Sequence, residues 1–232
     1  MLTTHAGALM PHIPTPPETD PYFSSVVLLL HPDAEQIVDR SQYAHALTIG
    51  SVSLSSDEPF LDNPVVMASA GIAATVMPAA SLAFARAANQ PFTIEYSIRI
   101  PQFLEVGQSI YLMGWDPGIY HVMQGVSSST VQLIYNDLGG KSFGTLDTDR
   151  WYQLAISYDG ANMRTYIDGV RLSETPQLTN AVSGPAQFGA FDLPGSALNG
   201  FFGYLAEVRV TIGVARYTGA SYTPRTTQFP NS

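Results

Sequence analysis

The stretch that decides the fold is WYQLAISYDGANMRTYIDGV, residues 151–170. Two runs of alternating side chains flank a turn at residues 158–162, and Asp168-Gly169 follows the second run as another turn signal. Alternation with a period of two is typical of a β-strand, and Asp-Gly favours tight turns between antiparallel strands. The stretch therefore predicts a β-hairpin whose second strand runs into a further turn.

The same pattern recurs along the chain. FTIEYSIRI, residues 92–100, alternates apolar and polar side chains, and further strands are expected at residues 26–32, 46–49, 52–54, 109–115, 120–126, 130–136, 186–191 and 200–212. In residues 70–85 the alanine content allows a helix, but Pro78 and the alternation of Leu82 and Phe84 favour strand and loop. Strands at this spacing, with turn residues between them and no long amphipathic helix, predict one all-β domain, a sandwich or barrel.

Composition narrows the classes of function. The chain of 232 residues has no cysteine, which excludes disulfides and cysteine-ligated metals. Its net charge is −9, and Lys141 is its only lysine. A nucleic-acid partner is not expected, because proteins that bind nucleic acids usually carry a stripe of basic residues, and this sequence shows none. The sequence has no uninterrupted apolar run of membrane-spanning length and no recognisable signal peptide, so no membrane partner is expected either.

Residues 1–21 differ from the rest of the chain. Five prolines fall within residues 11–21, and proline disfavours helices and central strands. We expect an extended N-terminal arm at residues 1–21 and a single domain at residues 22–232. The arm is either a disordered tail or a segment that orders against a partner. In the second case Leu9, Met10 and Ile13 are the side chains available to fill a pocket on that partner.

Three stretches together resemble a known family. They are FTIEYSIRI (92–100), DRWYQLAISYDGANMRTYIDGVRL (149–172) and GFFGYLAEVRVTIGVARYTGASYTPRTTQFP (200–230). The chain resembles the concanavalin A-like lectin/glucanase superfamily, and within it the laminin-G-like jelly rolls found in structural proteins of tailed phages. The resemblance covers roughly residues 22–230, and its most specific part is the ending from Glu207 to Pro230.

The resemblance implies a two-sheet antiparallel jelly-roll sandwich. In this fold the N-terminal strand near residues 26–30 lies close to the C-terminal strand near residues 206–212. It also implies a virion location and, as partners, other capsid or tail proteins. Further copies of the same chain and host-surface glycans are expected partners as well.

Glycosidase chemistry is not expected. It needs two carboxyl groups about 5–9.5 Å apart, which glucanase relatives place in a Glu-x-Asp-x-Glu run that this sequence lacks. Glu95 stands alone, and Glu207 is followed by Arg209. The histidines have no metal-like spacing, and no nucleophile motif is present. We therefore expect no enzymatic activity and no cofactor.

Three groups of residues remain as candidate sites. Exposed aromatic residues near predicted loops could stack on glycans: Trp115, Tyr120 and Tyr135. Several lectin-like relatives bind calcium through loop oxygens, for which the candidates are Asp116, Asn136 and Asp137; these residue types also favour turns without any metal. A structural lock is expected in the family-like ending, formed by Glu207, Arg209, Arg216 and Tyr217, with Arg216 bonded to a carboxylate or to carbonyls.

The leading hypothesis from the sequence is a non-enzymatic virion protein, displayed on the capsid or on a tail appendage and attached by its arm. A free carbohydrate-binding lectin and a divergent glycosidase are the alternatives. Binding to a glycan array, release of reducing sugar and co-purification with particles would separate the three.

Overall fold

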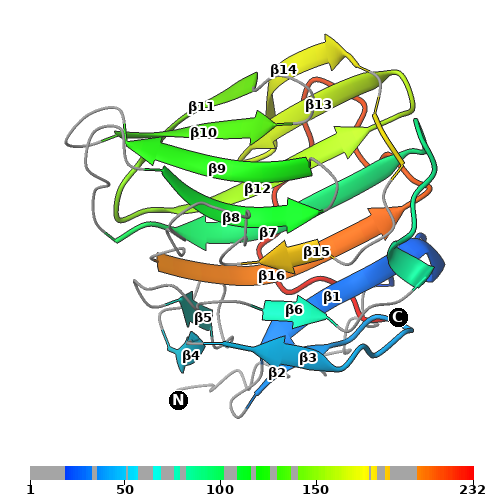
Figure 1. Cartoon of the computed structure of the whole chain (residues 1–232). Coiled ribbons are helices and arrows are strands. Elements are labelled where there is room, and N and C mark those ends of the chain that lie inside the picture. The colour runs from blue at the N-terminus through cyan, green and yellow to red at the C-terminus, as the bar shows by residue number, and fades with distance from the viewer. Residues whose placement is uncertain are drawn as a thin grey trace, which may run out of the picture.

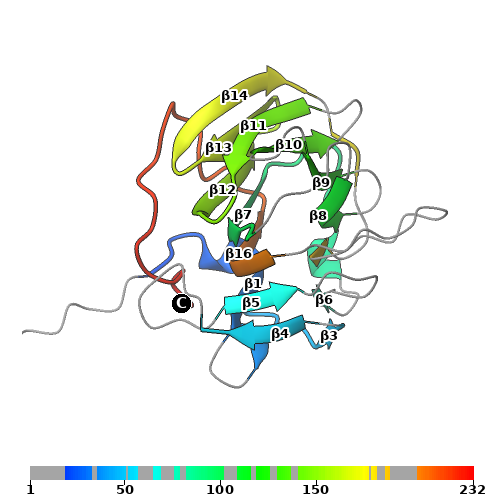
Figure 2. The same cartoon turned by 90° about the vertical axis from the view of Figure 1, so that its left-hand side faces the viewer.

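The computed structural model describes residues 19–32, 36–50, 52–56, 65–68, 76–78, 82–101, 109–115, 119–125, 130–136, 141–177, 179–181, 186–188 and 203–232. Two antiparallel sheets face each other (Figure 2), which confirms the predicted all-β sandwich. The predicted boundary between arm and domain stays a prediction, and Leu9, Met10 and Ile13 lie outside the described residues.

The first sheet has nine strands (Figure 1). In spatial order they are β14 (Val170–Pro176), β13 (Asn162–Ile167), β12 (Trp151–Tyr158), β7 (Phe92–Arg99), β16 (Gly203–Ile212), β1 (Val26–Pro32) and β2 (Ile37–Asp39), with β5 (Val65–Ala68) beside β16 and β4 (Val52–Ser55) beside β5.

The second sheet has seven strands. In spatial order they are β11 (Lys141–Asp147), β10 (Thr130–Asn136), β9 (Ile119–Gly125), β8 (Ser109–Trp115), β15 (Ala186–Phe188), β6 (Val76–Pro78) and β3 (Leu47–Ile49). The described helical turns are two short 3-10 segments, η1 (Phe23–Ser25) and η2 (Leu82–Phe84). In the described part of the chain no helix is long and apolar enough to cross a membrane.

The stretch at residues 151–170 forms the predicted hairpin. β12 pairs with β13, and Asp168 and Gly169, both at positive φ, turn the chain into β14. β1 lies beside β16, with Leu28 opposite Val210 and Leu30 opposite Val208. The expected neighbourhood of the N-terminal and C-terminal strands is therefore confirmed.

The core lies between the sheets. The alternating apolar residues of β7 and β12 face it, and Phe92, Ile94, Ile98, Ile156 and Tyr158 are completely buried. Removing these side chains from water drives the folding of the sandwich, at roughly 25 cal/mol for each Å² of apolar surface.

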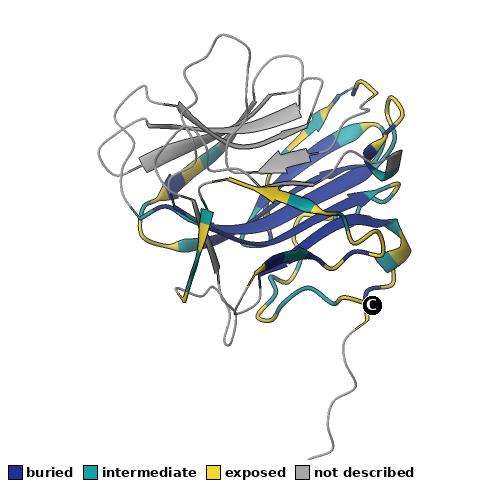
Figure 3. Cartoon of the chain, turned by 60° about the horizontal axis from the view of Figure 1, so that its bottom comes forward, coloured by how far each residue is buried: buried dark blue, intermediate teal, exposed yellow. Residues whose placement is uncertain are grey.

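Part of the outer face of the nine-stranded sheet, along β7 and β12, is buried as well (Figure 3). Thr93, Ser97 and Ser157 alternate with core residues, yet each is at most 3% exposed. Residues 213–232, which we call the C-terminal strap, run along this face (Figure 2). Thr93 Oγ1 donates to the carbonyl of Val214 at 3.0 Å and accepts from the N–H of Arg216 at 2.9 Å. These polar side chains are therefore buried by the strap, and Thr93 holds the strap in place through its hydrogen bonds.

Candidate functional site

A buried cluster of charges lies beneath the C-terminal strap. Arg216, on the strap, binds Asp20 through both terminal nitrogens, with Nη1–Oδ1 at 2.9 Å and Nη2–Oδ2 at 2.7 Å. Its Nε donates to Thr211 Oγ1 on β16 at 2.8 Å. The carboxyl side chain of Asp20 is 1% exposed and that of Arg216 is 7% exposed. This fork therefore ties the start of the described chain to the strap and to the sheet.

Arg209 of β16 joins the same cluster from the sheet. Its Nε donates to Glu95 Oε2 on β7 at 2.8 Å, and its Nη1 donates to Asp20 Oδ2 at 3.1 Å. Its guanidinium also lies 3.8 Å from the centre of the Phe229 ring, on the strap. Burial disfavours the charge, but the nearby carboxylates of Glu95 and Asp20 hold the pKa of Arg209 above its ordinary value. Two guanidiniums therefore neutralise two buried carboxylates.

Three tyrosines close the cluster on the side of β13. Tyr217 and Tyr222, both on the strap, stack with ring centres 3.8 Å apart, and Tyr166 of β13 meets both rings edge-on. The hydroxyl of Tyr217 donates to Glu95 Oε1. Burial and the neighbouring Glu95 carboxylate raise the pKa of both strap tyrosines, so their hydroxyls stay protonated.

Glu207 lies at an irregularity in β16. Ala206 pairs with Ser97 and Arg209 with Glu95, so β16 carries one residue more than β7 between these pairs. Glu207 adopts a φ of 53°, in the left-handed region. Such a β-bulge re-aims a side chain. The Glu207 carboxylate accepts the backbone N–H of Phe229 at 3.0 Å, and Nε2 of His31 lies 3.1 Å from the same oxygen.

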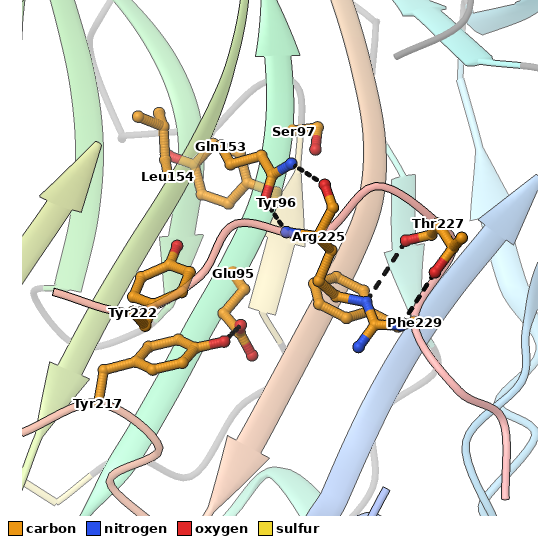
Figure 4. A pocket seen from close by; sticks show the side chains of 10 residues that line it. All are labelled: Glu95, Tyr96, Ser97, Gln153, Leu154, Tyr217, Tyr222, Arg225, Thr227 and Phe229. Carbon is orange, nitrogen blue, oxygen red and sulfur yellow. Dashed lines mark hydrogen bonds between the residues drawn. The ribbon is translucent and has the colours of Figure 1, made fainter. Parts of the chain in front are cut away.

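A small hollow separates the strap from the sheet (Figure 4). Its volume is about 10 Å³, the space of a single water molecule, and its lining includes Ser97, Gln153, Tyr222, Thr227 and Phe229. Gln153 Nε2 donates to the carbonyl of Arg225 at 2.5 Å, and the N–H of Arg225 donates to Gln153 Oε1 at 3.0 Å. The hollow is too small for a sugar ring, so this region serves to hold the strap.

The aromatic residues predicted for glycan binding lie on the other sheet. Tyr120 of β9 pairs with Asn136 of β10, which follows Tyr135 in sequence. On its other side Tyr120 pairs with Gly114 of β8, which precedes Trp115. The three aromatic candidates and the calcium candidate Asn136 thus lie at one end of three adjacent strands. Their side chains are not among those described.

The calcium prediction stays a prediction. Asp116 and Asp137 lie outside the described residues, and of Asn136 only the backbone is described. Within the part of the chain that the structure describes, no group of three or more histidines, aspartates or glutamates could hold a metal ion.

The structure adds one member of the cluster that the sequence did not suggest. Asp20 lies inside the predicted arm, 196 residues before its partner Arg216. No local signal marks it, because an aspartate among prolines and threonines reads as part of a solvated tail. Glu95 was identified, but only as an isolated carboxylate.

Comparisons with known proteins agree with this architecture. A profile of the concanavalin A-like lectin/glucanases superfamily matches residues 75–213, which is more than half of the chain. The chain belongs to the concanavalin A-like lectin/glucanase superfamily. A search of curated protein sequences gave no match.

Solved structures with the same fold include the binding domain of Paraclostridial Mosquitocidal Protein 1, with a TM-score of 0.63, 15% identity, and coverage of 86% of this chain and 51% of that one. The binding domain of botulinum neurotoxin serotype G has a TM-score of 0.62 at 13% identity, over 84% of this chain and 49% of that one. This chain thus spans about half the length of these toxin domains.

A third similar structure matches over nearly its whole length. It is domain 4 of AbnA, a GH43 extracellular arabinanase from Geobacillus stearothermophilus, in complex with arabinotriose. Its TM-score is 0.58 at 16% identity, and the match covers 82% of this chain and 93% of that one. At such identities the likeness extends to the fold alone.

The charge cluster predicts acid sensitivity. Burial opposes ionisation of Asp20, but hydrogen bonds from Arg216 and from the N–H of Tyr22, and the charges of both arginines, hold its pKa below 3.8. A carboxyl group whose pKa is lower in the folded state than in the unfolded state stabilises the fold at pH values above its unfolded-state pKa. That stabilisation is lost as the pH falls through the folded-state pKa. We expect the free energy of unfolding to fall below pH 3.8, as measured by urea denaturation.

The control for this prediction is Asp20→Asn, which cannot titrate. It should be less stable than the parent at pH 7 and should lose less stability on acidification. Asp159 contributes in the same direction in both proteins. Burial opposes its ionisation, but bonds from the N–H groups of Asn162 and Ala161 and from Arg164 lower its pKa to about 2. If the free energy of unfolding fell equally steeply with pH in the parent and in Asp20→Asn, the acid sensitivity would not come from Asp20.

Truncation tests where the domain begins. The predicted arm of residues 1–21 includes Asp20, whose N–H donates to the carbonyl of Ser232 at 2.8 Å. Deletion of residues 1–18 should leave the melting temperature unchanged. Deletion of residues 1–21 should cost about 2–3 kcal/mol, because it removes charge-assisted hydrogen bonds from Arg216 and Arg209. Equal thermal melts of the two truncations would show that Asp20 does not stabilise the sandwich.

Proposed function

We propose that this chain is a non-catalytic, saccharide-binding module of a tailed-phage particle. Residues 1–21 attach it to a capsid or tail protein, and the sandwich contacts host-surface glycans. A virion location and attachment through the arm are inferred from the likeness of the ending, Glu207 to Pro230, to phage structural proteins. Saccharide binding is supported by the superfamily and by the arabinotriose complex of the arabinanase domain.

The observation that carries the non-catalytic part is the engagement of the carboxylates. Glu95 binds Arg209 and Tyr217, and Glu207 accepts the N–H of Phe229. Glu95 is 3% exposed and Glu207 is 2% exposed. A glycosidase needs an acid and a base that reach the glycosidic bond. These two carboxylates instead fix the strap to the sheet.

The experiment uses the purified full chain on a glycan array, in a reducing-sugar assay with a polysaccharide panel, and in co-sedimentation with phage particles. We expect binding on the array, no sugar release, and co-sedimentation that is lost on deletion of residues 1–18. Turnover that disappears in Glu207→Gln would establish the glycosidase alternative. Array binding without co-sedimentation would favour a free lectin.

A further inference from the structure

A row of three side chains crosses the outer face of the nine-stranded sheet. Arg99 of β7 pairs with Trp151 of β12 on one side and with Tyr204 of β16 on the other. Residues that pair directly across antiparallel strands have side chains on the same face. Arg99 alternates with Glu95 and Ser97, so this face is the one that carries the strap. We call these three residues the Arg99 row.

The Arg99 row lies next to a point where the strap is bonded to the sheet. Arg225 of the strap bonds Gln153, which stands two positions further along β12 than Trp151. The side chain of Arg99 is 22% exposed, and Trp151 and Tyr204 are also partly exposed. The row therefore meets solvent, whereas Thr93, Ser97 and Ser157 on the same face are buried.

The geometry of the row suits a small amphipathic ligand. The rings of Trp151 and Tyr204 have centres 6.2 Å apart and planes inclined by 52°. The Arg99 guanidinium lies 5.4 Å from the centre of the Tyr204 ring, and its Nη2 is 2.5 Å from Asp149 Oδ1. Asp149 is 66% exposed. Two apolar ring surfaces thus flank a donor and an acceptor that are held side by side.

The indole N–H of Trp151 is a polar group that the described part of the chain does not satisfy. Its Nε1 is shielded from solvent, and among the described residues it has no hydrogen-bond acceptor. A shielded donor without an acceptor is uncommon in folded proteins and calls for an explanation. A ligand oxygen that reached it would supply the acceptor.

We propose that the Arg99 row is a binding site for a neutral saccharide. The apolar C–H face of a sugar stacks on Trp151 and Tyr204, and two adjacent hydroxyls bond the guanidinium of Arg99 and the carboxylate of Asp149. The ligand is neutral because the Arg99 and Asp149 charges compensate each other. This inference rests on the proposed saccharide binding, and it locates that binding on the nine-stranded sheet. The site is distinct from the predicted residues Trp115, Tyr120 and Tyr135 on the other sheet.

The two tryptophans of the chain allow a direct test, because each belongs to one candidate site. Trp115→Phe leaves Trp151 as the only indole, and Trp151→Phe leaves Trp115. Both variants are titrated with arabinotriose and with the neutral oligosaccharides that the wild-type chain binds on the array, while the indole fluorescence is recorded. We expect the emission of Trp151 to shift on saturation and that of Trp115 to stay constant.

Affinity measurements complete the test. Trp151→Ala and Tyr204→Ala should each weaken binding about tenfold or more, as for aromatic residues at the centre of an interface. Tyr43→Ala, which truncates an aromatic side chain that is 45% exposed and lies near β2, should leave affinity unchanged. Binding should also be insensitive to salt between about 50 and 500 mM, because no net charge is recognised.

The outcomes separate this inference from the proposed function. If the wild-type chain binds saccharide but only the emission of Trp115 responds, the Arg99 row is not the site and the proposed function stands. If the wild-type chain binds no saccharide at all, the proposed glycan binding itself fails. Trp115→Phe keeps the Arg99 row intact, so the fluorescence arm does not depend on a destabilised variant.

Discussion

Arg216→Ala is expected to destabilise the fold by about 3–5 kcal/mol, because it leaves a buried carboxylate without its bidentate partner. The side chain of Asp20 is 1% exposed and accepts hydrogen bonds from both terminal nitrogens of Arg216. Arg209 alone would then face Asp20 and Glu95, two carboxylates for one guanidinium. The measurement is urea denaturation at pH 7.

Two further variants sharpen this prediction. Arg150→Ala removes an arginine of the surface, 59% exposed, that pairs with Asp168. It should cost no more than about 1 kcal/mol, because solvent screens exposed ion pairs. The double variant Arg216→Ala with Asp20→Asn should lose less than the sum of the single variants, since the charge left behind is removed. An Arg216→Ala protein as stable as Arg150→Ala would show that the fork does not hold the strap.

Saccharide binding gives a second readout of the same variant. The strap contacts the sheet through Gln153 beside the Arg99 row, so loosening it at Arg216 should act mainly on stability. A variant with the parent's stability but without binding would place Arg216 in a binding site rather than in the lock.

The two-sheet architecture could be predicted from the sequence because the pattern that indicates a strand is local. The alternation at residues 92–100 and 151–158 specifies an apolar face, and burying that face requires a second layer. The sequence could not tell that Thr93, Glu95 and Ser97 are buried too. Their cover is the strap, more than 110 residues later, and polar side chains at outer positions look the same whether they meet water or another segment.

The charge cluster was predictable only in part. Glu207, Arg209, Arg216 and Tyr217 belong to the family-like ending, and the resemblance alone drew attention to them. Alternation gives no hint of the bulge at Glu207, because the letters AEVRV read as an uninterrupted strand. The Arg99 row was hidden for a different reason: its members come from three strands, and only the register brings them together.

The second large effect is expected at Gly169, the turn glycine between β13 and β14. Its φ is +76°, and a Cβ at this position would lie 2.2 Å from the carbonyl oxygen of Tyr222 and 2.9 Å from Pro224 Cδ. The backbones meet so closely because the N–H of Tyr222 donates to the carbonyl of Gly169 at 2.8 Å. The atoms in the way belong to backbone and to a proline ring, so they cannot rotate aside.

Gly169→Ala should therefore force the strap away from the turn. The left-handed conformation costs an alanine about 1–2 kcal/mol, and the overlap adds about 1–3 kcal/mol or more. We expect a total loss of about 2–5 kcal/mol, together with faster proteolytic cleavage within residues 213–232. Thermal melts and limited proteolysis measure the two effects.

Gly213→Ala is the matched control for this substitution. Its φ of +87° imposes a similar conformational cost, but a Cβ there would meet nothing closer than Gln90 Nε2 at 4.0 Å. The difference in stability between the two variants therefore isolates the contact of the strap with the turn. If Gly169→Ala and Gly213→Ala lose the same stability, the close approach of Tyr222 contributes nothing. The strap would then be held by its other contacts, among them the cluster around Asp20 and Glu95 and the bonds of Glu207 and Gln153.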